Sequence, residues 1–342
     1  MTRPVLVVSD DRHALHDPPH EVNFGRRVAP GWERPDRIGA LRSGLDEIEE
    51  RPAQPHDDGP LLAVHDPDLV AFLADGYDRW RASGGPEVMI PDTFPIPRLR
   101  DGGRPSPSHL GNVGWWCFDT ATPVVSGSYE AARAAVDVAL TAADAVADGA
   151  PLAYALTRPP GHHAGRDYYG GFCLFNGAAV AARHLTAGGR VAVLDVDYHH
   201  GNGTQDIFWT SDDVLYVSVH AGPGAAFPYF TGHADEIGQG AGRGWNVNLP
   251  LPRHTEDDDF LAALEGALER IDAAEVATLV VSLGFDTYRG DPIGGFDLTT
   301  EVYAEVGARI ASLGLPTLLI QEGGYDLDSL GANLASLLAG LA

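Results

Sequence analysis

Short apolar runs, each followed at once by a cluster of polar residues, are the feature that most restricts how this chain can fold. They begin near residues 5, 151, 190, 214, 278 and 316 and read VLVVSDD, PLAYALTRPPGHH, RVAVLDVDYHH, VLYVSVH, TLVVSLGFD and PTLLIQEGGY. Apolar runs of this length between turn residues are typical of strands buried on both faces, and such strands form parallel sheets. The runs therefore predict a central, mainly parallel β-sheet.

Helical patterns lie between these runs, over residues 128–147, 177–187, 257–273 and 300–313. Strands that alternate with helices indicate an α/β fold in which right-handed crossovers place helices on both faces of the sheet. The chain is 44% hydrophobic and 21% charged, which is enough to bury a substantial core. Because no linker-like composition divides it, we expect residues 1–342 to form one domain.

Segment 86–123 interrupts this alternation. It is rich in proline and glycine and shows no clear period, yet it carries Phe94, Trp115, Trp116 and Phe118. Long irregular segments in compact domains are functional loops or disordered linkers, and aromatic residues argue against disorder. We expect a loop insertion that serves as a lid or as a subunit contact.

Charge and composition limit the partners. Acidic residues outnumber basic ones by 48 to 23, which gives a formal charge of -25. Such a surface repels phosphate backbones and attracts cations, so no direct nucleic-acid partner is expected; the charge fits solubility as well as a cationic substrate. No apolar run reaches the roughly 18 residues that span a membrane. Cys117 and Cys173 are too few for a disulfide framework, and no signal-peptide pattern is present, so we expect a cytoplasmic protein.

Polar residues cluster where the expected strands end. In an open parallel sheet the ligand site lies outside the carboxyl ends of the strands. Alternation along the DVDYHH run puts residues 195, 197 and 199 on one side. The polar residues at the ends of the later runs are His162 and His163; Asp195, Asp197 and His199; Ser218 and His220; Asp286; and Glu322 to Tyr325.

Asp197, His199 and Asp286 form a candidate metal site. Two buried carboxylates and an imidazole are costly unless hydrogen bonds or a metal satisfy them. An Asp, His, Asp set with open positions suits zinc, with iron as the chemical alternative. A structural network of hydrogen bonds and salt bridges is the other interpretation of the same residues.

His162, His163 and Tyr325 are candidates for the chemistry beside that metal. The two histidines follow RPPG, a rigid turn directly after a strand. A lone histidine there would be structural, but an adjacent pair beside a metal site suits general acid and base catalysis. Tyr325 ends a flexible Gly-Gly turn, and its phenol can donate to a developing oxyanion.

Four motifs in this order resemble those of the histone deacetylase superfamily, which has the arginase-deacetylase fold: RPPGHHAGRDYYGGFCLFN, VLDVDYHHGNGTQDIFW, VSLGFDTYRGDPIGGF and QEGGYD. The resemblance runs from about residue 5 to 340 and is strongest from 157 to 326. Within the superfamily the chain is most similar to bacterial acetylpolyamine amidohydrolases and class II deacetylases. The segment before residue 124 resembles the insertion that builds the dimer and narrows the entrance in the acetylpolyamine branch, which implies a homodimer.

The resemblance implies a role for each matching residue. Asp197, His199 and Asp286 would bind zinc together with a water. His163, leaning on Asn202, would be general base and then acid, while His162, oriented by Asp195, would be its electrostatic partner. Tyr325 would donate to the oxyanion. The tunnel walls and rim for an aliphatic amine stem would be Gly171, Phe172, Phe227 and Ile293.

Structural potassium ions are also implied by the resemblance, held largely by backbone carbonyls. The positions that match the inner ion are Asp195, Asp197, His199, Ser218 and Val219. Those that match the outer ion are Phe208, Ser211 and Val214. Oxygen ligands suit such a hard cation.

The expected function is zinc-dependent hydrolysis of an acetylated primary amine on a small molecule, such as an acetylpolyamine or an acetyl-lysine compound. The alternatives are a protein lysine deacetylase, a binding module without turnover, and an arginase-like site with two manganese ions. One departure concerns the substrate: where the acetylpolyamine branch has glutamates, this chain has His109, Leu110 and Ala121, with Asp119 nearby.

Overall fold

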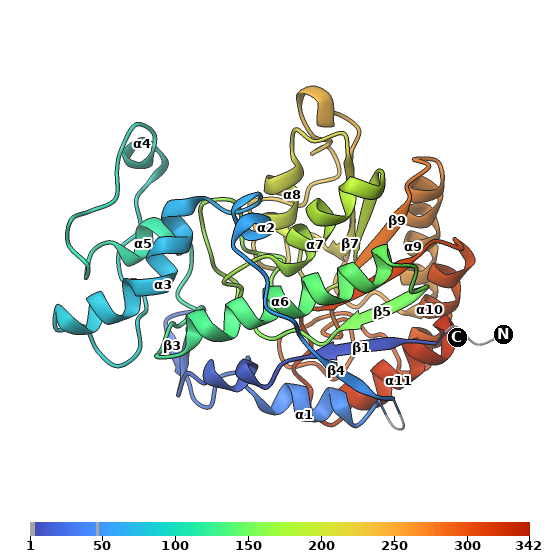
Figure 1. The fold of residues 1–342 in the computed structure, drawn as a ribbon, viewed down its shortest axis with the longest axis horizontal. Helices are drawn as coiled ribbons and strands as arrows, with labels where there is room; N and C mark the ends of the chain where they lie inside the picture. Colours follow the sequence, from blue (N-terminus) through green and yellow to red (C-terminus); the bar gives the residue numbers. More distant parts are fainter. Residues whose placement is uncertain (1–3, 46–47) are drawn as a thin grey trace.

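An eight-stranded parallel sheet forms the centre of the computed structural model, which describes residues 4–45 and 48–342 (Figure 1). The strand order is β4-β1-β5-β10-β9-β6-β7-β8, and every neighbouring pair is parallel. All six predicted runs are strands of this sheet, so the predicted fold class is confirmed. Their bounds are β1 Leu6–Ser9, β5 Leu152–Ala155, β6 Val191–Asp195, β7 Val214–Ala221, β9 Thr278–Leu283 and β10 Thr317–Gln321.

The two edge strands, β4 (Glu50–Pro52) and β8 (Asn246–Leu251), were not expected from the sequence. β4 reads ERP and β8 reads NVNLPL, so both mix polar residues with proline. An edge strand pairs on one side only and tolerates proline and polar residues. These strands therefore lack the continuous apolar run that marks the six inner ones.

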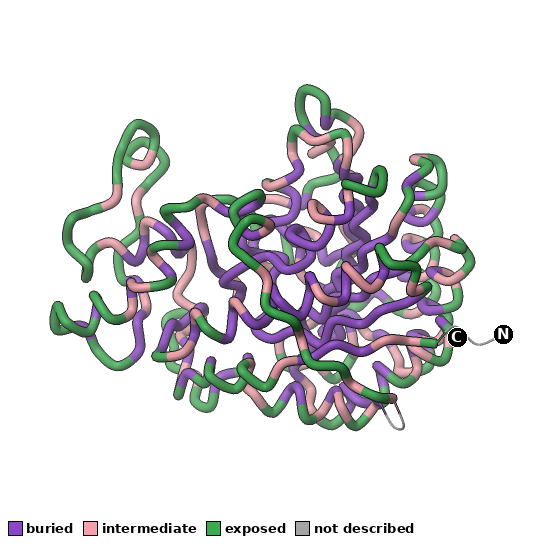
Figure 2. The backbone as a smooth tube through the Cα atoms, viewed as in Figure 1, coloured by how far each residue is buried: buried purple, intermediate pink, exposed green. Residues whose placement is uncertain are grey.

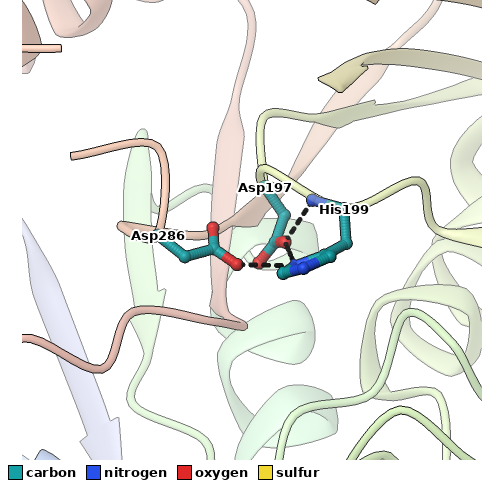
Figure 3. Close-up of side chains that lie close together, drawn as sticks. All are labelled: Asp197, His199 and Asp286. Atoms are coloured by element: carbon teal, nitrogen blue, oxygen red, sulfur yellow. Dashed lines mark hydrogen bonds and ion pairs between the residues drawn. The ribbon is translucent and has the colours of Figure 1, made fainter. Parts of the chain in front are cut away.

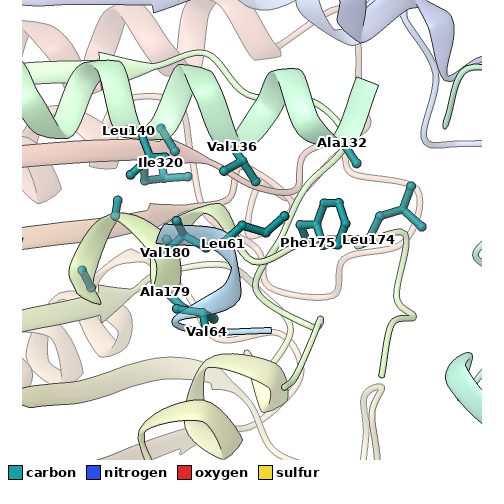
Figure 4. Close-up of a cluster of buried hydrophobic side chains, with 14 of the residues drawn as sticks. Leu61, Val64, Ala132, Val136, Leu140, Leu174, Phe175, Ala179, Val180 and Ile320 are labelled. Atoms are coloured by element: carbon teal, nitrogen blue, oxygen red, sulfur yellow. The ribbon is translucent and has the colours of Figure 1, made fainter. Parts of the chain in front are cut away.

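Alternate residues of the inner strands face two separate hydrophobic cores. In β6, Val191 and Val193 belong to one core, and Ala192 and Leu194 belong to the other. Buried residues concentrate along the strands in Figure 2. Burying a valine or leucine side chain contributes about 1.5–3 kcal/mol to stability. Figure 4 shows part of the first core, which includes Leu61, Val136, Leu140, Phe175, Val180 and Ile320.

Helices cover both faces, as predicted. The first core packs against α6 (Ser128–Ala147) and α7 (Gly177–Leu185), and the second packs against α1 (Asp36–Arg42), α9 (Asp257–Asp272), α10 (Val302–Ser312) and α11 (Leu330–Leu341). Asn176 caps α7, because its side chain accepts a hydrogen bond from the Ala179 N–H. None of the helices in the described part of the chain combines the length and apolar character that a membrane-spanning segment requires.

A small hairpin and several short helices lie outside these layers. Strands β2 (Glu21–Asn23) and β3 (Arg26–Val28) form an antiparallel pair. Helices α2 (Gly59–Leu62) and α3 (Pro67–Ala82) precede the irregular segment, and α8 (Asn202–Phe208) follows β6. The 3-10 helices are Asp11–Leu15, Thr186–Gly188 and Gly240–Gly242.

Segment 86–123 holds only the short helices α4 (Pro97–Arg100) and α5 (Val113–Trp116). Trp116 anchors it, since this side chain is buried and stacks on Phe72 with ring centroids 5.9 Å apart. The stretch around α4 projects away from the sheet in Figure 1 and exposes Ile96 and Leu99. Its role as a lid or subunit contact stays a prediction.

Candidate active site

Asp197, His199 and Asp286 come together at the carboxyl ends of β6 and β9 (Figure 3). One ligand atom from each lies within 4.8 Å of the others. His199 Nδ1 lies 2.9 Å from Asp286 Oδ2 and 3.5 Å from Asp197 Oδ1. Among residues 4–45 and 48–342 this is the one such group of three acidic, histidine or cysteine side chains.

Asp197 and His199 are brought together by a turn after β6, not by the strand alternation that the sequence suggested. β6 ends at Asp195, so Asp197 and His199 are not alternate residues of a strand. Instead, the chain turns back on its own carboxylates: the Asp197 N–H donates to Asp195 Oδ1 and the His199 N–H donates to Asp197 Oδ1. The expectation of strand alternation was wrong here, because aspartates bond readily to the backbone two residues on.

Glycines give these carboxylates their space. A Cβ on Gly284 would meet Asp197 Oδ2 at 2.1 Å, and one on Gly323 would meet it at 2.6 Å. The Gly323 N–H donates to the same oxygen at 2.9 Å, and the Tyr198 N–H donates to Asp286 Oδ1. Any larger residue at these glycines would displace the ligand set.

The electrostatics of the cluster are those of a cation site. Burial and the charge of Asp197 raise the pKa of Asp286 to about 7. Burial opposes the charge of His199, but hydrogen bonds that Asp197 and Asp286 accept from its imidazole raise its pKa to about 9. Burial would also raise the pKa of Asp197, yet His162 and His199 hold it below its usual value. Two carboxylates this close need a positive charge between them.

The adjacent histidines stand beside this cluster with their rings 4.1 Å apart. His162 Nδ1 lies 3.1 Å from Asp195 Oδ2, and His163 Nδ1 lies 2.7 Å from Asn202 Oδ1. Burial disfavours charge on both rings, but Asp197 and Asp195 raise the pKa of His162 to about 10. Burial and the charges of His162 and His199 put the pKa of His163 well below its usual value. Neighbouring groups whose pKa values are shifted in opposite directions are typical of active sites that use one group as an acid and the other as a base.

Glu322 fixes the backbone that carries the two histidines. Its Oε2 accepts hydrogen bonds from the Gly161 and His162 N–H groups, at 2.6 and 3.1 Å. Burial raises the pKa of Glu322 to about 7, and the charge of His162 opposes that shift. β10 thus holds the turn that follows β5 in position.

Tyr325 faces the same cavity from the turn after β10. Burial raises the pKa of its phenol well above the usual value, so it is a proton donor at neutral pH. The Arg37 guanidinium lies 4.6 Å above its ring and donates to the Gly324 carbonyl. Asp291 accepts the Tyr325 N–H at 2.6 Å. Arg37 lies outside the four motifs, and Asp291 lies within VSLGFDTYRGDPIGGF but received no role from the sequence.

A cavity of about 530 Å³ opens onto these groups. Gly171, Phe172, Phe227 and Ile293, the expected tunnel residues, all line it. Phe227 meets His163 edge to face with centroids 5.0 Å apart, and Phe172 meets Tyr325 at 5.5 Å. Gly171 has φ +59°, and a Cβ there would meet the His163 ring at 2.3 Å, so the wall requires glycine.

Only the end of segment 86–123 reaches this cavity, through Asp119, Thr120 and Ala121. Asp119 Oδ2 accepts the Gly171 N–H at 2.5 Å, and Thr122 Oγ1 accepts the Phe172 N–H at 2.8 Å. His109 and Leu110 are exposed and do not line the cavity.

Other walls of the cavity were not expected. The hairpin contributes Val22, Asn23, Phe24, Arg26 and Val28, and Arg253 comes from the turn after β8. Short turns with exposed side chains give no periodic signal, so sequence reasoning could not find them.

The positions matched to potassium lie in two places. Asp195, the last residue of β6, pairs in register with Ser218 within β7, and Val219 is the next residue of β7. Phe208 ends α8, Ser211 follows it, and Val214 begins β7. Ser211 and Asp213 are hydrogen-bonded to each other.

The cluster fits a divalent metal by the chemistry of its donors. Two carboxylates and one imidazole, buried and already oriented by backbone N–H groups, make three protein ligands and leave positions open, which is the pattern of catalytic zinc. A basic imidazole and a phenol donor share the cavity with them. Fold and site together define the class: a hydrolase that acts on a carbonyl group such as an amide.

Comparison with known proteins gives the family. The histone deacetylase domain model matches residues 32–341. Acetylpolyamine amidohydrolase 1 of Pseudomonas aeruginosa is 44% identical over 98% of both chains, and acetylpolyamine amidohydrolase of Mycoplana ramosa is 40% identical over 98% of this chain and 99% of its own. The crystal structure of an acetylpolyamine aminohydrolase from Burkholderia pseudomallei superposes with a TM-score of 0.93 at 38% identity, covering 98% of each chain. The chain belongs to the histone deacetylase family.

Proposed function

We propose that this protein is a zinc-dependent deacetylase that hydrolyses the amide of small acetylated primary amines. The observation that carries the proposal is one cavity that joins the Asp197, His199 and Asp286 cluster to His163 and Tyr325. The relatives named acetylpolyamine amidohydrolases, similar over nearly the whole chain, support the substrate class.

The metal would be held by Asp197, His199 and Asp286, and when bound it supplies Lewis-acid polarisation of the amide carbonyl and activation of water. Zinc suits this donor set, and iron is the chemical alternative. Potassium near Ser218 and Val219, and near Phe208, Ser211 and Val214, belongs to the same proposal.

His163 is the proton carrier in this scheme. Asn202 Oδ1 accepts from its Nδ1–H, which leaves Nε2 free to accept a proton. Because its pKa is depressed, the imidazole is neutral and can take the proton of the attacking water, then deliver it to the departing amine. His162, held by Asp195, stays charged and favours the negative charge that develops in the transition state.

Tyr325 donates a hydrogen bond to the oxyanion. Its phenol stays protonated because burial raises its pKa, and Arg37 and Asp291 fix its backbone and ring. A donor fixed before the reaction contributes more than a mobile one, because no reorganisation is needed.

The test is steady-state kinetics on acetylated diamines, acetylpolyamines and acetyl-lysine peptides. Tyr325→Phe should lower kcat about 10²–10³-fold with KM nearly unchanged. Tyr303→Phe is the matched control, because Tyr303 is also buried but its hydroxyl pairs with Thr287 outside the cavity. Hydrolysis of none of these amides would overturn the proposal, and faster turnover of peptides than of every small amide would assign a protein deacetylase instead.

A homodimer completes the proposal. The stretch around α4 projects from the sheet and exposes Phe94, Ile96 and Leu99, side chains that a second copy could cover. Sedimentation of the wild type and of Leu99→Asp would test it, with a lower mass expected for the variant.

A further inference from the structure

Two arginines, Arg26 and Arg253, are among the residues that line the cavity. Both side chains are exposed, and neither guanidinium makes a hydrogen bond or ion pair with any other residue that the structure describes. Arg253 lies against the wall, since a Cβ on Gly295 would meet its Nη2 at 3.3 Å and the Tyr198 hydroxyl at 2.6 Å. Because both arginines line the cavity and are also exposed to solvent, they mark its mouth.

The hairpin directs Arg26 inward. Asn23 and Arg26 are opposite each other in the β2–β3 ladder, joined by the two-residue turn of Phe24 and Gly25, which have φ 51° and 72°. Positive φ at both positions is typical of the tight turns that fix hairpin register. Asn23 and Arg26 both line the cavity, whereas the next residue, Arg27, does not.

Within the described part of the chain, no carboxylate in the cavity lining is free to balance these arginines. Asp119 and Asp197 are the two carboxylates that the described residues contribute there. Asp119 already accepts hydrogen bonds from the N–H groups of residues 121, 122 and 171. Asp197 belongs to the candidate metal site.

Of the four carboxylates directly beside a lining residue in the sequence, Asp291, Glu33 and Glu21 are also matched, and Asp326, beside Tyr325, is not. Asp291 accepts four backbone N–H groups, from residues 293, 294, 325 and 326. Glu33 pairs with Arg37 and Arg158 at 3.0 and 2.8 Å. Glu21 accepts from Asn23 and is buried. The mouth is thus locally positive on a chain whose formal charge is -25.

A substrate at the mouth feels the two nearby arginines more strongly than the distant acidic surface, because electrostatic interactions are screened with distance. The Debye length is about 8 Å at physiological ionic strength, so acidic groups spread over the rest of the surface are largely screened there. Two guanidinium groups in the lining act at contact distance and offer bidentate donors that match a carboxylate.

We propose that the mouth of this cavity binds an anionic group, so that the preferred substrates are acetylated primary amines whose far end carries a carboxylate. This inference rests on the proposed deacetylase function and specifies its substrate class. An amine stem with a second ammonium group at its far end would meet Arg26 and Arg253 and be disfavoured.

Three amides with the same five-methylene stem test the inference: 6-acetamidohexanoate, N-hexylacetamide and N-acetylcadaverine, which end in a carboxylate, a methyl and an ammonium group. We expect kcat/KM to fall in that order, with about tenfold or more between the first amide and the last. The carboxylate gains an attraction of the size typical of an exposed charge pair, and the ammonium group suffers a repulsion of similar size, so the two effects add. Raising the salt concentration should shrink this ratio. Arg26→Met and Arg253→Met should each lower the ratio. Arg27→Met, at the neighbouring exposed arginine that does not line the cavity, should leave it unchanged.

A higher kcat/KM for N-acetylcadaverine, or equal values for the charged amides, would overturn the inference while leaving the deacetylase function intact. A carboxylate preference that both Arg26→Met and Arg253→Met leave unchanged would also overturn it. Absence of turnover on all three amides and on the acetylpolyamines would instead overturn the proposed function itself.

Discussion

Replacing Gly323 by alanine should weaken metal binding without unfolding the protein. The new Cβ would lie 2.6 Å from Asp197 Oδ2 and 2.8 Å from Asp286 Oδ2. To reach ordinary contact distances near 3.5 Å, the two oxygens must then move by about 0.9 and 0.7 Å. Metal sites tolerate about 0.2 Å of error in ligand distance, so metal affinity should fall by about 10–100-fold, or roughly 1.4–2.7 kcal/mol.

Competition with a chelator of known zinc affinity measures this loss directly, and kcat/KM at limiting zinc should fall in parallel. Gly266→Ala is the matched control: Gly266 lies within α9, where an added Cβ meets nothing within 4 Å. That change should stabilise the protein by up to about 1 kcal/mol and leave zinc affinity unchanged. Wild-type zinc affinity in a folded Gly323→Ala protein would refute the assignment of Asp197 and Asp286 as ligands.

Two further predictions concern groups around the site. Asp291→Asn should lower kcat/KM by about tenfold or more, because a carboxylate that holds the Tyr325 N–H is replaced by an amide. In a Tyr325→Phe background the same substitution should lower kcat/KM only slightly further. If the full loss in kcat/KM persisted in that background, Asp291 would act on a group other than Tyr325. Burial, with repulsion from Glu33, raises the pKa of Glu21 to about 7 from an ordinary value of 4.5. Its contribution to stability is therefore complete below pH 4.5 and is lost as the pH rises through 7, by on the order of 3 kcal/mol. The melting temperature of Glu21→Gln relative to the wild type should therefore rise between pH 5 and pH 8. A difference in melting temperature that does not change with pH would contradict the raised pKa of Glu21.

The sheet was predictable because burial on both faces forces apolar runs into the sequence. The inner strands show this in β6 and β9, whose residues are almost all inaccessible to solvent. β4 and β8 escaped prediction because an edge strand needs no such run, and the hairpin escaped because three-residue strands carry no periodicity.

Part of the site was predictable because the carboxyl ends of parallel strands lie along the same edge of the sheet. That argument brought Asp197 and Asp286 together, although the turn after β6, rather than strand alternation, makes the contact. Arg26 and Arg253 could not be found this way, because exposed arginines are common and only the folded chain shows which ones face a cavity.

Metal dependence is the central claim, and stoichiometric reconstitution tests it most directly. Protein stripped by a chelator should hydrolyse N-acetylated amines at a negligible rate. Activity should rise linearly with added zinc and stop rising at one equivalent per chain, while Asp286→Ala should fail to recover at that ratio. Full turnover by metal-free protein, or saturation at two equivalents of manganese, would contradict a single metal held by Asp197, His199 and Asp286.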